Sequence, residues 1–277
     1  MKDYFLSEEE FDVLTCDNCG LLFTSPRPDP TVIGKYYQSD TYYSHQENKK
    51  GFIPRIYEFV KSINIKNKVN MAIGNLSQGK LLDIGCGVGD FLFHVKNKGW
   101  EIVGIELSEQ AKNVAESRLG FRPMAPSETS SLDDDSFDVI TLWHVLEHID
   151  DLKFQTSEIY RLLKPGGRLV IALPNFQSFD CQYYKEFWAA WDVPRHLNHF
   201  SQKTLQKMLV SLGFLPVDTK KLIWDAFYIS FLSEKYLHHS LPLLRGAWTG
   251  LRSNFKARRS GMYSSLVYLF EKPKGHE

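Results

Sequence analysis

Short apolar runs alternate with longer amphipathic stretches along most of this chain. Runs of about four to eight leucine, isoleucine, valine and aromatic residues are typical of buried strands. Because helical stretches separate the first four runs, the pattern predicts an α/β protein with a parallel, doubly wound sheet. The runs occupy residues 80–84, 101–106, 137–144, 168–174, 214–223 and 264–271.

Helix signals fill the intervals between these runs. Ser108 is a suitable N-cap for the helix that follows it, and Ser201 is suitable for a helix that Gly213 ends. Residues 162–167, Leu-Leu-Lys-Pro-Gly-Gly, predict the end of another helix. We also expect a helix over residues 52–75, before the first strand.

The loop after the first run contains three glycines spaced by two. Leu81–Asp90 reads Leu-Leu-Asp-Ile-Gly-Cys-Gly-Val-Gly-Asp. Glycine allows a sharp turn and lets a ligand approach the main chain, and the next helix offers unpaired N–H groups. A dinucleotide fingerprint needs glycine at position 90, where this chain has aspartate. With Asp83 before it, the loop therefore favours a zwitterionic amino-acid tail over a pyrophosphate.

An acidic residue ends the second run. Glu106 follows Gly89 by 17 residues, and in nucleotide-binding α/β folds an acid at about this distance hydrogen-bonds the ribose hydroxyls. An unpartnered acid at an apolar sheet edge costs free energy. Asp83 and Glu106 are therefore both predicted to bind a ligand.

These motifs, in this order, resemble those of class I S-adenosylmethionine-dependent methyltransferases. LLDIGCGVGD resembles the first motif of that family, Glu106 its ribose-binding acid, SFDVITLWHVLEH its fourth strand and LLKPGG the turn before its fifth. The resemblance implies a Rossmann-like, mostly parallel sheet of seven strands, with 214–223 and 264–271 as antiparallel strands six and seven. It also implies S-adenosyl-L-methionine as cofactor, and it places at the cofactor Asp83, Gly85, Cys86, Gly87, Gly89, Glu106, Leu107, Glu128 and Trp143.

A narrower resemblance involves CDNCGLLFTSPRPDP, WHVLEH and WAAWDVPRHLNHFS. These stretches are similar to methyltransferases of Bacteroides-type polysaccharide gene clusters, and VLEH is also similar to ubiquinone-biosynthesis O-methyltransferases. The resemblance implies O-methylation of a small molecule or of a glycan or lipid precursor. A protein or RNA methyltransferase and a non-catalytic, cofactor-binding regulatory module are the alternatives. Trp143 is interpreted either as packing beside adenine or as a core residue.

Histidine and arginine supply the candidate acceptor chemistry. Methyl transfer to a hydroxyl benefits from a general base, usually histidine, so His144 and His196 are the candidate catalytic residues. Trp191, Arg195 and His196 are expected to bind the acceptor, because an arginine fork beside an imidazole recognises carboxylate or phosphate oxygens. The alternative is that these histidines pack or cap, and that the loop over residues 183–200 is structural.

Two places carry metal-ligand residue types, and we predict no metal ion at either. Cys16 and Cys19 form half of a tetrahedral zinc site, but the other half is missing. A tight turn without metal is the favoured interpretation, and zinc is the alternative. Glu147 stands in the run His-Val-Leu-Glu-His, but two histidines and an acid from one helical turn rarely face one point.

Bulk properties limit the remaining choices. The 277 residues include 33 basic and 33 acidic side chains, so no global charge attracts nucleic acid. Neither a signal peptide nor a membrane span is visible, and four cysteines give no disulfide framework, so we expect a cytoplasmic protein. We expect an N-terminal knuckle or cap over 1–50 and a methyltransferase domain over 51–277. Its helical insertion, 225–260, has a basic end that is interpreted as a solvated face or lid, or as a peripheral membrane contact.

Overall fold

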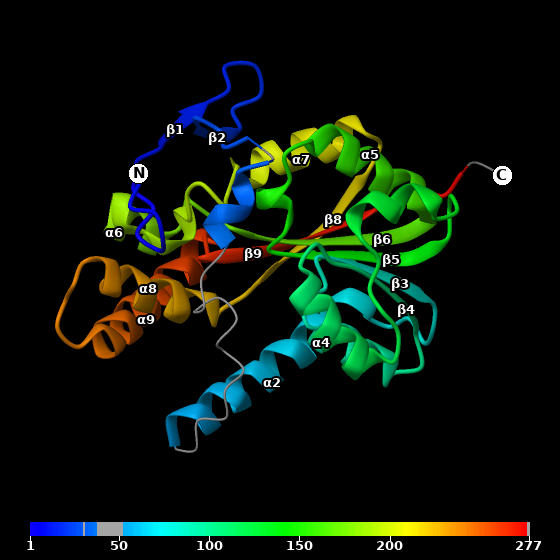
Figure 1. Cartoon of the computed structure of the whole chain (residues 1–277), viewed down its shortest axis with the longest axis horizontal. Coiled ribbons are helices and arrows are strands. Elements are labelled where there is room, and N and C mark those ends of the chain that lie inside the picture. Colours follow the sequence, from blue (N-terminus) through cyan, green and yellow to red (C-terminus); the bar gives the residue numbers. More distant parts are fainter. Residues whose placement is uncertain (30, 38–51, 276–277) are drawn as a thin grey trace.

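The computed structural model describes residues 1–29, 31–37 and 52–275. Its centre is a six-stranded sheet with four parallel strands, as the alternating apolar runs predict (Figure 1). Two antiparallel strands complete one edge, also as expected. In spatial order the strands are β4 (Glu101–Ile105), β3 (Lys80–Ile84), β5 (Phe137–Trp143), β6 (Leu163–Pro174), β9 (Ser265–Glu271) and β8 (Leu215–Lys221).

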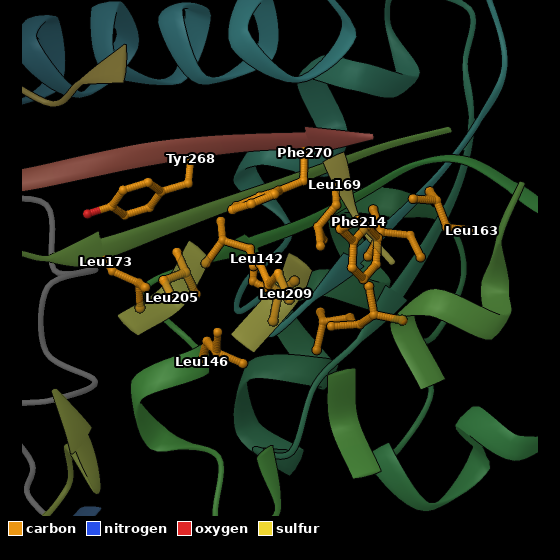
Figure 2. Close-up of a cluster of buried hydrophobic side chains, with 14 of the residues drawn as sticks. Leu142, Leu146, Leu163, Leu169, Leu173, Leu205, Leu209, Phe214, Tyr268 and Phe270 are labelled. Carbon is orange, nitrogen blue, oxygen red and sulfur yellow. The ribbon is translucent and has the colours of Figure 1, made fainter. Parts of the chain in front are cut away.

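Helices cover both faces of this sheet (Figure 1). On one face α5 and α7 bury the apolar cluster that Figure 2 shows in close-up, and on the other α2, α3 and α4 bury a second cluster. Successive strand residues point to opposite faces, so Ile140 enters the first cluster and Val139 the second. The helices are α2 (Phe52–Ile73), α3 (Asp90–Lys96), α4 (Glu109–Leu119), α5 (Leu152–Leu162) and α7 (Gln202–Ser211).

Side-chain caps begin two of these helices where the sequence predicts them. The Ser108 hydroxyl accepts a hydrogen bond from Ala111 N at 3.3 Å, and that of Ser201 accepts one from Thr204 N at 3.1 Å. The predicted helix end near residue 162 is also confirmed. The strand that follows is longer than predicted, because β6 begins at once at Leu163 and a register shift against β5 absorbs the extra residues.

The sheet has six strands where seven were expected. A single parallel bridge joins Ile105 to Met124 at the edge beside β4. Met124 N donates to Gly104 O at 2.9 Å, and Met124 O accepts from Glu106 N at 3.0 Å. Pro123 and Pro126 flank the bridge, and proline has no N–H for a ladder, so the pairing does not extend.

A second sheet of three strands joins the N-terminal segment to the chain after β6. β1 (Asp12–Thr15) pairs with β2 (Leu22–Ser25), and β2 pairs with β7 (Asn198–His199). β7 follows the short helix α6 (Phe179–Tyr184). The N-terminal segment is thus anchored on residues about 175 positions away. The predicted boundary at residues 50 and 51 lies outside the described residues.

Two helices form the predicted insertion between β8 and β9. These are α8 (Asp225–Tyr236) and α9 (Pro242–Ser260). They approach closely at Gly246 and Gly250, where a Cβ would lie within 3.0 Å of atoms of α8. Because β9 begins beside the end of β6, the pair lies at the carboxyl end of the parallel strands (Figure 1). Within the described ranges, no helix is long and apolar enough to cross a membrane.

Candidate active site

The glycine loop lies between β3 and α3, at the carboxyl end of the parallel strands. Gly85, Gly87 and Gly89 have φ values of +73°, +54° and +78°, a region that favours glycine. A Cβ at Gly85 would overlap Val145, so this glycine is needed for packing. A Cβ at Gly87 would meet no atom within 4 Å. The main chain at Gly87 is therefore open to a ligand.

The Glu106 carboxylate joins this loop to the start of α4. Gly87 N donates to Oε2 and Ser108 N donates to Oε1, both at 2.8 Å. A carboxylate offers about four lone-pair sites, so each oxygen can accept a further hydrogen bond from a ligand hydroxyl. Leu107 follows and is 78% exposed, which leaves an apolar side chain beside the acid.

Asp83 lies on β3, two residues before the loop, and is buried. Thr141 Oγ1 donates to Asp83 Oδ1 at 2.6 Å. Burial raises the pKa of Asp83 to about 7, against the opposing effects of the Thr141 hydrogen bond and the Lys68 ammonium group. Lys68, on α2, lies 4.9 Å from the centre of the Trp143 ring. Sequence reasoning missed Lys68, because a lysine on an amphipathic helix usually faces solvent.

Three other predicted cofactor residues have contacts within the chain. Cys86 is buried, and burial raises the pKa of its thiol. The Trp143 ring packs edge-on against Phe91 at 5.4 Å, as in its interpretation as a core residue. Glu128 Oε2 accepts a hydrogen bond from Ala125 N at 2.6 Å and so caps the 3₁₀ turn Pro126–Ser131.

His144 follows β5 directly, with φ +59°, and its side chain reaches α8. Its Nε2 lies 3.1 Å from Asp225 Oδ2, and its Nδ1 lies 3.5 Å from Glu147 Oε1. Burial disfavours the charged ring, but hydrogen bonds and charge from Asp225 and Glu147 outweigh burial and raise the pKa of His144 to about 9. Sequence reasoning missed Asp225, because it lies 81 residues from His144 along the chain.

Comparison with known proteins identifies the family. A sequence profile of the methyltransferase domain family matches residues 58–219, more than half of the chain. The chain belongs to this family. The ubiquinone biosynthesis O-methyltransferase of Alkalilimnicola ehrlichii is 24% identical over 193 residues, which cover 61% of this methyltransferase and 78% of that relative.

Two solved structures share the fold of this methyltransferase. Phosphoethanolamine N-methyltransferase 2 of Haemonchus contortus, solved with S-adenosyl-L-methionine, superposes with a TM-score of 0.57 at 17% identity over 91% of this chain and 62% of its own. This chain therefore spans less than two thirds of that protein. A possible histamine N-methyltransferase of Thermotoga maritima superposes with a TM-score of 0.53 at 20% identity, over 80% of this chain and 96% of its own. The expected class I methyltransferase is confirmed in family and fold.

In this methyltransferase, Arg195 is buried rather than open to an acceptor. Its side chain is only 2% exposed. All five N–H groups have partners: the Asp3 and Asp192 carboxylates accept from four of them, and Tyr36 O accepts from the fifth at 3.1 Å. The Phe5 ring lies 4.7 Å from the guanidinium carbon. These contacts favour the structural interpretation of the loop, because no donor of Arg195 is left for an acceptor.

The other two predicted acceptor residues also pack within the loop. Trp191 Nε1 donates to Lys185 O at 2.9 Å, and its ring stacks on Phe176 at 6.2 Å. His196 is 7% exposed, and its Nδ1 lies 2.9 Å from Ala190 O. The acceptor roles assigned to these residues gain no support from their described surroundings.

The Cys16 and Cys19 pair lies in the turn between β1 and β2. Gly20 N donates to Cys16 O at 2.8 Å and closes the turn, and both thiols are free. Across the part of the chain that the structure describes, no third histidine, cysteine or acid side chain joins them in a metal-binding group. The described contacts are those of the tight turn that the sequence favours.

Proposed function

We propose that this methyltransferase binds S-adenosylmethionine at the glycine loop and methylates a hydroxyl oxygen of a small molecule, such as a glycan or lipid precursor. The observation that carries this proposal is the Glu106 carboxylate, which Gly87 N and Ser108 N hold beside an open stretch of main chain. S-adenosylmethionine supplies an activated methyl group when it is bound. The protein then has to align the acceptor, exclude water and handle one proton.

Each cofactor residue has a role that its surroundings support. Glu106 would accept hydrogen bonds from two ribose hydroxyls. Asp83 and the N–H groups of the loop would hold the amino-acid tail, and a ligand ammonium beside Asp83 would favour its ionised form. Leu107, exposed beside Glu106, would cover one face of the adenine ring. Trp143 would support this site from its place in the core.

His144 and Asp225 form the proposed proton-handling pair. They lie 3.1 Å apart at the tip of β5, the edge where ligands bind in open α/β sheets. A hydroxyl acceptor loses its proton when its oxygen gains a methyl group, and a positioned histidine in its neutral form typically takes such a proton. Because the pKa of His144 is about 9, the neutral ring becomes more populated as pH rises toward 9, and turnover should rise with it. Asp225 would fix the ring and stabilise its charged form.

The proposed acceptor class rests on this pair and on a relative of similar sequence. The Alkalilimnicola ehrlichii relative is named for O-methylation in ubiquinone biosynthesis, which supports a hydroxyl acceptor. We propose that the acceptor lies beside the His144–Asp225 pair, rather than against Arg195, whose donors are all in use. The 1–50 segment would serve as a cap on a methyltransferase domain that covers 51–277.

Helix α9 supports a peripheral contact with an anionic membrane. Its sequence contains five basic residues and no acid. Five apolar side chains of α9 are 55–65% exposed: Leu243, Leu244, Trp248, Leu251 and Phe255. An apolar stripe with basic neighbours is typical of helices that lie on lipid surfaces. Such a contact would bring the site close to a lipid-linked acceptor.

A product screen tests the proposed reaction. Purified protein and S-adenosylmethionine would be incubated with sugar nucleotides, phenols, quinols and lipid-linked precursors, and the product characterised by NMR. We expect a new methyl group on oxygen. A methyl group on nitrogen or carbon would contradict the acceptor atom, and failure to bind S-adenosylmethionine by calorimetry would contradict the cofactor.

A further inference from the structure

A cluster of metal-ligand side chains lies beside the proposed active site. Glu147, His148 and His196 each place one ligand atom within 4.8 Å of the others. Glu147 and His148 belong to the 3₁₀ turn Leu146–His148, whereas His196 comes from the loop before β7. A helical turn alone rarely directs three ligands to one point. Here the third ligand comes from a loop 48 residues further along, so that geometric objection does not apply.

Glu147 is a buried acid whose carboxylate makes no short hydrogen bond. It is 1% exposed, and neither carboxylate oxygen has a partner of good hydrogen-bond geometry among the described residues. The charged His144 ring gives only a long contact, with Nδ1 3.5 Å from Oε1, and His196 Nε2 lies 4.0 Å from the same oxygen. Buried carboxylates are normally paired, hydrogen-bonded or bound to a metal.

The two histidines present unprotonated nitrogens. His196 Nδ1 lies 2.9 Å from Ala190 O, and His148 Nδ1 lies 2.9 Å from Arg195 O. A carbonyl oxygen only accepts, so each Nδ1 carries the proton and each neutral ring keeps its lone pair on Nε2. The Tyr37 hydroxyl, 3.0 Å from His148 Nδ1, is then a second acceptor of that proton. Metal-bound histidines typically donate their other N–H to a carbonyl or carboxylate in this way.

Two further histidines are excluded from the ligand set by their own hydrogen bonds. Thr24 Oγ1 donates its one proton to His196 O at 2.6 Å. In its second contact, 3.0 Å from His199 Nε2, the Thr24 oxygen can therefore only accept. That nitrogen of His199 therefore carries a proton. His144 directs Nε2 to Asp225.

The cluster thus brings one carboxylate oxygen and one ring nitrogen of each neutral histidine within 4.8 Å of one another. The charged His144 ring, 3.5 Å from Glu147 Oε1, offsets part of the charge of that carboxylate, and a metal ion bound by all three groups would offset the rest. We propose that Glu147, His148 and His196 bind a divalent first-row transition-metal ion, such as zinc. This inference does not rest on the proposed methylation.

The donor set and its surroundings decide the class of metal. Imidazole nitrogens suit zinc, iron, cobalt and nickel, whereas magnesium and calcium prefer oxygen donors. Bonds of about 2.0–2.2 Å place tetrahedral ligands about 3.4 Å apart, so ligand atoms that lie within 4.8 Å of one another need to approach by at most about 1.4 Å. Three protein ligands leave a position free. A small cavity beside the cluster, lined by Glu147, His196, Trp188 and Phe200, offers room for that fourth ligand.

Metal binding to the full chain tests the inference directly. The parent would be the C16S/C19S double variant, stripped with chelator, so that the cysteine pair contributes nothing. We expect calorimetry to show about one Zn²⁺ per chain, and Co²⁺ to give visible absorption bands with nitrogen ligation. Zn²⁺ should also raise the thermal midpoint of unfolding, because it binds the folded state.

Matched variants separate this site from adventitious binding. E147Q, H148Q and H196Q should each weaken Zn²⁺ binding by at least about 100-fold. Loss of a residue that only hydrogen-bonds a metal ligand typically costs about 10- to 100-fold. H238Q, which changes an exposed histidine in the turn after α8, should bind as the parent does. If H196Q does not fold, E147Q and H148Q still decide the result. Full binding in those two variants, displacement of Co²⁺ by Mg²⁺, or no binding by the parent would overturn the inference.

Discussion

Asp225 Oδ2 lies 3.1 Å from His144 Nε2, although 81 residues separate the two along the chain. Asp225 begins α8, and His144 follows β5, so the insertion reaches back to the edge of the sheet that holds the glycine loop. The two helices of the insertion therefore contribute to the proposed active site as well as to its outer surface.

Removal of the His144 ring should slow turnover without weakening cofactor binding. General acid–base residues typically contribute 10²- to 10⁴-fold, so we expect H144Q to lower kcat by about that range. D225N should cause a smaller loss, because it keeps an acceptor oxygen for the ring but removes the charge. H94Q on α3 is the control. Wild-type turnover in H144Q, measured by product formation under saturating cofactor, would exclude the proposed role.

Loss of the Glu106 carboxylate should weaken S-adenosylmethionine binding. Two hydrogen bonds to a charged acceptor are lost, so E106A should cost about 1.5–3 kcal/mol, or about 10- to 100-fold in Kd by calorimetry. E101A changes an acid at the opposite end of the same strand and should leave Kd unaltered. Equal effects of the two substitutions would mean that Glu106 does not contact the cofactor.

Asp83 should make cofactor binding depend on pH. The ionised form attracts a ligand ammonium, so affinity should fall as the pH drops below about 7, the pKa of Asp83 in the free protein. Lys68 and Glu106 are the charged groups that act on it. D83N should bind weakly at all pH values and show no such slope. A wild-type slope in D83N, measured with S-adenosylhomocysteine between pH 5.5 and 7, would assign the titration to another group.

The same aspartate should lower stability when it is ionised. Its pKa is about 7 in the folded protein and 3.8 in the reference state, so the folded state loses stability as pH rises from about 4 to about 7. Each pH unit between the two values corresponds to 1.36 kcal/mol, which gives an upper figure of about 4 kcal/mol. D83N, which keeps an acceptor for Thr141, should therefore unfold at higher urea than wild type at pH 8. Lower stability of D83N at that pH would contradict the raised pKa.

Local signals in the sequence predicted much of the fold, and long-range pairing explains what they missed. Ser108 and Ser201 were found because a helix cap depends on residues within one turn, and Glu106 because its distance from the glycines follows from one α/β unit. The seventh strand that the sequence analysis expects is reduced to a single bridge at Met124. The prolines on either side of Met124 explain why the pairing does not extend. Arg195 was assigned to the acceptor because its partner Asp3, 192 residues away, has no local signature.

Truncation of Arg195 should destabilise the protein. R195A leaves the buried carboxylate of Asp3 without its cation, and breaking a buried pair typically costs about 3–5 kcal/mol. The control is R122A, whose solvent-exposed ion pairs with Glu109 and Glu116 are screened by water and should contribute little to stability. Urea unfolding measures both. A stable R195A with impaired acceptor binding would restore the acceptor role.

Anionic vesicles should bind the protein through α9. Vesicles of three parts phosphatidylcholine to one part phosphatidylglycerol should co-sediment with wild type, and W248S/F255S should abolish this. R252E/R259E should weaken it at least about tenfold, since each basic residue near such a surface contributes about 1 kcal/mol. V210S/L215S removes exposed apolar groups elsewhere and should bind normally. Equal loss in that control would show non-specific adsorption.

The edges of the main sheet limit how two molecules can associate. Beyond β4, the prolines around Met124 leave few N–H groups for another strand. At the opposite edge, β8 carries Pro216, a register irregularity, and lysines at 220 and 221, which are features that discourage strand addition. Any assembly of this methyltransferase is therefore expected to use helices or loops, and its sheet should end within each molecule.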